Sequence, residues 1–131
     1  MSLPAEVADN FFGELELVDE SAYACEVSWN RDLAIRVFIH IEGQNYREVI
    51  ENAKEQFLLV REKEEAIFEE GAGRTSLGEH ADDFLDSALD TSIEIYPNGS
   101  GTLVYLVMMG GTLIIELTPD CNCGDAQFLP G

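Results

Sequence analysis

The sequence predicts an α+β domain in which an antiparallel sheet of about five to seven strands carries two helices on one face, in the order β-β-β-α-α-β-β-β(-β). Three observations favour this fold class. Apolar and polar residues alternate toward both ends of the chain, apolar residues follow a helical period in the middle, and short turn sequences separate the expected strands. The chain has 131 residues, of which 46% are hydrophobic, so we expect a single domain over residues 1–131.

Three strands are expected before residue 42. The run from Phe11 to Val18 alternates apolar residues with glutamates, which is the period of a strand with one wet face. The runs Tyr23 to Trp29 and Leu33 to Ile41 are separated by a short polar loop, so we expect them to form a hairpin. One face of the third strand is expected to be buried, and it carries Leu33, Ile35, Val37, Ile39 and Ile41.

A first helix is expected from about residue 45 to residue 70. Eight apolar side chains fall on one helical stripe there: Tyr46, Val49, Ile50, Ala53, Phe57, Val60, Ile67 and Phe68. Glu64 falls on the same stripe, so we expect the last two turns to fray or bend. Gly71 is expected to end the helix in the left-handed conformation that favours glycine.

A second helix is expected to begin at Ser76, because Glu79 lies three residues later and the pair forms a capping box. Its apolar face would carry Leu77, Ala81, Phe84, Leu85 and Ala88. The opposite face would carry a one-sided acidic surface, for which we predict a partner-binding role together with two glutamates at its rim. The predicted partner-binding residues are Glu69, Glu70, Glu79, Asp82, Asp83, Asp86 and Asp90.

The rest of the chain is expected to form strands. They are Ser92 to Tyr96, Thr102 to Met108, Leu113 to Thr118 and a short run from Ala126 to Leu129. The strand Thr102 to Met108 is apolar on both faces, so we expect it to lie centrally, with one face under the helices. Its other face would be covered by the second helix or by a partner chain.

The charge balance narrows the classes of partner. Lys and Arg number 7 against 26 Asp and Glu, for a formal net charge of −19, which repels nucleic acid and anionic membranes and favours a basic protein. The longest apolar runs are too short to cross a bilayer, and the first residues lack the features of a signal peptide. An odd number of cysteines, three, is common in a reducing compartment, so we expect a cytoplasmic protein.

No catalytic residue, metal site or cofactor is predicted. His40 and His80 lack the spacing of metal ligands, and Cys121 and Cys123 lack the second pair that a zinc site requires. The loop from Gly71 to Ser76 matches no phosphate-binding fingerprint, and we interpret it as a plain connection.

Two aromatic residues could either pack in the core or anchor a partner. Trp29 and Tyr23 fall on the same strand face as Cys25 and Val27, which favours core packing over an exposed anchor.

Several short segments resemble small bacterial domains of unknown function, some groups of which are suspected immunity proteins of polymorphic toxin systems. The resemblance covers most of the chain in its order of elements. It depends on Phe12-Gly13-Glu14-Leu15, Ser28-Trp29-Asn30, the strands Ile93 to Asn98 and Gly111 to Leu117, and the terminal Gly131. It implies a cytoplasmic protein that neutralises a basic toxin domain by covering its active site, and it supplies no catalytic residues.

Three functional hypotheses follow from the sequence. The first is a non-enzymatic binding module, of an immunity or antitoxin type, that meets a basic partner through its acidic helix. The second is a small enzyme or ligand-binding domain with a pocket between helices and sheet. The third is a homodimer joined through the uncovered sheet face or an edge strand.

Overall fold

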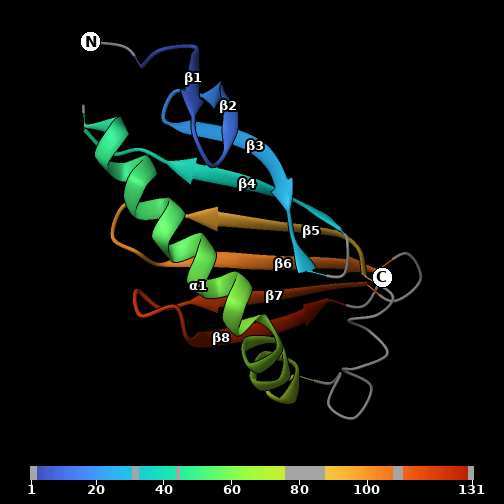
Figure 1. Cartoon of the computed structure of the whole chain (residues 1–131). Helices are drawn as coiled ribbons and strands as arrows, with labels where there is room; N and C mark the ends of the chain where they lie inside the picture. The colour runs from blue at the N-terminus through green and yellow to red at the C-terminus, as the bar shows by residue number, and fades with distance from the viewer. Residues whose placement is uncertain (1–2, 31–32, 44, 76–87, 108–110, 130–131) are drawn as a thin grey trace.

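The computed structural model describes residues 3–30, 33–43, 45–75, 88–107 and 111–129, and shows one sheet with a helix across one of its faces (Figure 1). The elements are β1 (Glu6–Asp9), β2 (Gly13–Asp19), β3 (Ala22–Ser28), β4 (Ala34–His40), α1 (Tyr46–Gly73), β5 (Ala88–Ile95), β6 (Gly101–Val107), β7 (Gly111–Leu117) and β8 (Cys123–Leu129). The eight strands lie in the sheet in chain order, from β1 to β8.

The sheet is mixed. Each pair of neighbouring strands is antiparallel except β4 and β5, which are parallel, with Arg36 opposite Ser92 and Val37 opposite Ile93. Parallel neighbours cannot be joined by a tight turn, and the connection between β4 and β5 contains α1. Helix α1 covers one face of the sheet, which we call the inner face.

The predicted fold class was wrong in the number and arrangement of its elements. The described residues contain one helix and eight strands in one mixed sheet, instead of two helices on an antiparallel sheet of five to seven strands. Strand β1 was missed because Glu6–Asp9 is too short for a period to stand out. Residues 76–87 of the expected second helix lie outside the described residues, and the last part of that prediction, at Ala88 and Asp90, belongs to β5.

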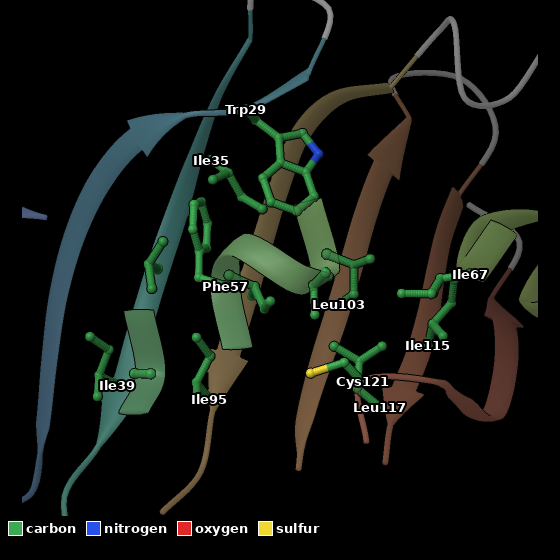
Figure 2. Packing of buried hydrophobic residues seen from close by; sticks show 14 of the residues in the cluster. Trp29, Ile35, Ile39, Phe57, Ile67, Ile95, Leu103, Ile115, Leu117 and Cys121 are labelled. Atoms are coloured by element: carbon green, nitrogen blue, oxygen red, sulfur yellow. The ribbon is translucent and has the colours of Figure 1, made fainter. Parts of the chain in front are cut away.

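The hairpin of β3 and β4 was predicted correctly, and its alternation explains the core. Ile35, Val37 and Ile39 of β4 are fully buried on the inner face, because β-branched side chains at every second position all point toward the helix. Figure 2 shows Ile35 and Ile39 from β4 with Ile95 and Leu103 from the next two strands, packed with side chains of α1 such as Phe57.

Helix α1 continues without the frayed end that Glu64 was expected to cause, and it reaches Gly73. Gly71 does not end it in a left-handed conformation. A Cβ atom at Gly71 would lie 2.8 Å from Cδ1 of Ile115, so this glycine allows the helix to approach β7 closely. The prediction was wrong because a glycine near a helix end can serve packing as well as termination.

Candidate functional site

The solvent side of α1 carries a row of glutamates, which we call the outer ridge. Its members recur at intervals of three, four or seven residues, the spacing that places side chains on one helical face. All six are exposed: Glu48, Glu51, Glu55, Glu62, Glu65 and Glu69. At 1.5 Å per residue the ridge is about 30 Å long, which is enough to contact a partner along several turns.

Two leucines interrupt the ridge at its middle. Leu58 is 37% exposed and Leu59 is 47% exposed. Both lie on the solvent side of α1 and not on its buried apolar side. They lie between Glu55 and Glu62 in sequence, so the acidic row has an apolar centre. An apolar centre within a charged surround is the usual composition of a protein-binding patch.

The ridge carboxylates have few partners of their own. Among the described residues none of the six forms an ion pair, and one hydrogen bond reaches them, from the Asn45 amide to Glu48. The helix also has four basic residues, and two of them, Lys54 and Arg61, lie over the ring of Phe11 at 5.8 and 5.9 Å from its centre. Arg47 lies over the ring of Tyr46, and the Lys63 ammonium donates to Oδ1 of Asn122, so among the described residues none of these four cations forms an ion pair with a ridge glutamate.

On the opposite side of the same helix, Glu64 is buried with only 1% of its surface exposed. Its Oε2 atom accepts hydrogen bonds of 2.6 Å from Trp29 Nε1 and of 2.6 Å from the Tyr105 hydroxyl. Its Oε1 atom accepts a 2.9 Å hydrogen bond from the Asn30 amide, which also donates to the Arg61 carbonyl oxygen at 2.9 Å. A buried carboxylate needs such donors, because removal from water would otherwise cost several kcal/mol.

The Glu64 group joins three parts of the fold. Trp29 and Asn30 follow the end of β3, Tyr105 belongs to β6, and Glu64 belongs to α1. The interface between helix and sheet is therefore not wholly apolar. Because both carboxylate oxygens already accept hydrogen bonds from the protein, this arrangement fixes the helix on the sheet and leaves no free group for a substrate.

The aromatic residues that were weighed as partner anchors are in the core. Trp29 is buried and lies 5.3 Å from Phe57 between ring centres (Figure 2), and Tyr23 is fully buried with its hydroxyl donating to the Pro4 carbonyl oxygen at 2.6 Å. The preference for core packing is confirmed.

The predicted partner-binding residues are only partly described. Glu69 and Glu70 are exposed near the end of α1, and Glu70 accepts a 2.7 Å hydrogen bond from Arg74 in an ion pair. Asp90 lies in β5 and not on a helix. The other predicted members, Glu79, Asp82, Asp83 and Asp86, lie outside the described residues, so their common helical face stays a prediction. The outer ridge was missed, although the same spacing was visible between residues 48 and 69.

The cysteines are poor nucleophiles. Burial, with smaller contributions from Asp9 and Glu26, raises the pKa of Cys25 to about 12. Burial also raises the pKa of Cys121 and of Cys123 above the ordinary value. Because the thiolate is the reactive form, a raised pKa lowers the reactivity of these thiols at neutral pH.

His40 lies on the face of the sheet opposite the helix, which we call the open face. Its Nε2 atom is 3.4 Å from Glu94 Oε1, and its ring stacks on Tyr96 at 4.7 Å between centres. His80 lies outside the described residues. Within the described ranges, no three His, Cys, Asp or Glu side chains are grouped so as to hold a metal ion.

The comparisons with known proteins add no relative. The chain matches no protein-family model, no curated protein and no solved structure. In the part of the chain that the structure describes, no helix combines the length and the apolar character that crossing a membrane requires.

Proposed function

We propose that this chain is a non-enzymatic binding protein for a basic protein partner, and that the outer ridge of α1 is its contact surface. The observation that supports this most strongly is the row of six exposed glutamates, which have no ion pair among the described residues and which surround Leu58 and Leu59. The net charge of −19 extends the same preference for a basic partner to the whole chain.

The ridge is costly to the free protein, which is the physical reason to assign it to a partner. Like charges at intervals of three or four residues destabilise an isolated helix by a few tenths of a kcal/mol per pair. Lys and Arg side chains of a partner would remove that repulsion and accelerate association, while Leu58 and Leu59 would supply the desolvated centre of the contact. Two ridges of the same sign repel, so this surface disfavours a homodimer.

A basic toxin domain, the partner that the resemblance to immunity proteins implies, has the required chemistry. Within this proposal such a complex forms in the cytoplasm, the compartment that the resemblance implies. Within this proposal Glu69 belongs to the ridge itself, and Glu79, Asp82, Asp83 and Asp86 stay predicted contacts of the same partner.

Site-specific photocrosslinking tests the location of the contact. A benzophenone side chain is placed at Leu58, and a matched control carries it at Val18 of β2, which is also apolar and is 52% exposed. In extracts of the native host at low salt, Leu58 is expected to crosslink one basic protein and Val18 is not. Equal crosslinking at both positions, or none at Leu58, would contradict the proposal.

A further inference from the structure

The ladder between β2 and β3 ends before either strand does. The two strands pair from Asp19 opposite Ala22 to Glu16 opposite Ala24, and no pair follows. Strand β2 begins at Gly13 and β3 extends to Ser28, so three residues of β2 and four of β3 run on beyond the last pair. Figure 1 shows β1 and β2 beside the first part of β3, with the second part of β3 continuing past them.

The backbone of β3 presents a free edge along this second part. The backbone N–H of Trp29 donates to the Leu33 carbonyl oxygen at 2.7 Å, and the backbone N–H of Ile41 donates to the Ser21 carbonyl oxygen at 2.7 Å. The backbone N–H and C=O groups of odd-numbered residues in β3 therefore point toward β4. Since backbone groups alternate along an antiparallel strand, those of Glu26 and Ser28 face away from β4, toward the gap. The Ser28 carbonyl oxygen accepts a 3.3 Å hydrogen bond from Arg61; Ser28 is exposed and Arg61 is half-buried.

A hollow lies on each side of this edge. On the helix side, a hollow of about 510 Å³ is lined by Phe11, Phe12, Val27 and Arg61, among others. On the open face, a hollow of about 400 Å³ is lined by Arg36 and by three glutamates, among other residues. The glutamates are Glu14, Glu16 and Glu26. The first hollow combines aromatic rings with the charged side chains of Glu26 and Arg61, and the second has an excess of negative charge.

We infer that the free edge of β3 at residues 25–28 binds an extended segment of a basic partner by strand addition. Successive side chains of a strand point to opposite faces, so a bound segment would place alternate residues in the two hollows. The aromatic hollow fits apolar side chains, and the hollow with three carboxylates to one guanidinium fits Lys or Arg. The occupant is therefore an extended segment in which apolar and basic residues alternate.

This site is distinct from the outer ridge and is tested separately. The probe is an acetylated and amidated peptide of seven residues in which four lysines alternate with three valines. Its control has the same composition with the lysines and valines in two blocks, which keeps the charge and removes the alternation. In ¹⁵N NMR titrations, we expect the amide signals of Glu26 and Ser28 to shift with the alternating peptide, which should bind about tenfold more tightly than the control.

Two variants separate the backbone contact from charge. Glu26→Pro removes an amide hydrogen that β4 does not use, a change that an edge strand tolerates, whereas Glu26→Gln removes only the charge. We expect Glu26→Pro to weaken binding about tenfold relative to Glu26→Gln. If Glu26→Pro fails to fold, a peptide N-methylated at its central valine, which also lacks a backbone donor, is expected to lose the same affinity.

Three results would overturn the inference: equal affinity for both peptides, shifts confined to α1, or shifts of Glu26 and Ser28 that depend on protein concentration without peptide. The last would assign the edge to a second copy of the chain. Binding of the alternating peptide should survive Glu→Gln changes on the outer ridge, so failure at the edge and failure at the ridge can be told apart.

Discussion

The two sides of α1 carry carboxylates in opposite situations. On the inner side, Glu64 is 1% exposed and accepts hydrogen bonds from Trp29, Asn30 and Tyr105. On the outer side, six glutamates are exposed and have no ion pair among the residues that the structure describes. The surroundings of a glutamate on this helix therefore decide whether its carboxylate is satisfied by donors of the fold or by water.

This difference separates stability from binding. Loss of a buried, hydrogen-bonded carboxylate leaves its donors without partners, which is expensive, whereas loss of an exposed one leaves only solvated groups. Substitutions on the inner side should therefore change the free energy of unfolding, and substitutions on the outer side should change affinity for a partner.

The largest expected effect is that of Glu64→Ala. The buried donors of Trp29 and Tyr105 would lose their acceptor and a cavity would remain, so we expect the free energy of unfolding to fall by about 3–5 kcal/mol. Urea unfolding followed by circular dichroism measures this. Glu62→Ala, two residues away on the outer ridge, is the matched control and should change stability by less than about 0.5 kcal/mol. Similar losses in the two variants would show that the two sides of the helix are not distinct.

Cys25 of β3 is a further acidic group whose burial disfavours the charged form. With its pKa raised to about 12, the thiol should react with iodoacetamide at pH 8 roughly a thousandfold more slowly than an unfolded cysteine. The unfolded thiol ionises near pH 9 and the folded one only near pH 12, so its contribution to stability is present below pH 9 and is lost as pH rises between these values. Rapid labelling of Cys25 in the native protein at pH 8 would contradict the raised pKa of this thiol.

Tyr105→Phe removes one of the donors to Glu64 and leaves the ring packing against Phe68 intact. We expect a loss of about 1–2 kcal/mol in the free energy of unfolding, because the carboxylate keeps its other donors. Thermal unfolding by calorimetry is the measurement, with Tyr96→Phe on the open face as the control. A loss as large as that of Glu64→Ala would mean that the hydrogen bond from Tyr105 alone, and not the set of hydrogen bonds to Glu64, holds the helix on the sheet.

The smallest expected effect on stability is that of the triple variant Glu55→Gln, Glu62→Gln and Glu69→Gln. Removing like charges should leave stability unchanged or raise it by a few tenths of a kcal/mol, and added salt should reduce the difference. Unfolding midpoints at low and high salt check this. A marked loss of stability would show that the ridge glutamates serve the fold.

The parts of the fold that the sequence predicted are those with a strong local period. The β3–β4 hairpin and α1 were predicted because their apolar residues repeat every two or every 3.6 positions. The parallel pairing of β4 with β5 joins residues more than 50 positions apart, such as Val37 and Ile93, and no local pattern reports it. The helical period predicted a helix that includes Ala88 and Asp90, but both residues belong to the strand Ala88–Ile95. Pairing with neighbouring strands overrides the local preference there.

The candidate site shows the same division. The outer ridge could have been found, because Glu48, Glu51 and Glu55 lie opposite the apolar stripe that had already been identified. The hydrogen bonds of Glu64 could not, since Trp29 and Tyr105 are 35 and 41 residues away in sequence. A glutamate on an apolar stripe looks like a defect until its distant donors are known.

The position of the negative charge on α1, more than its total, should determine the affinity for the partner. Once the protein crosslinked through Leu58 is purified, its affinity can be compared for two variants of equal net charge. One carries Glu55→Gln, Glu62→Gln and Glu69→Gln on the ridge, and the other carries Glu20→Gln, Glu42→Gln and Asp120→Asn at exposed sites elsewhere. By isothermal titration calorimetry, we expect the ridge variant to bind about tenfold more weakly and the control to bind like the unmodified protein. Equal affinities for the two variants would contradict the assignment of the outer ridge as the contact surface.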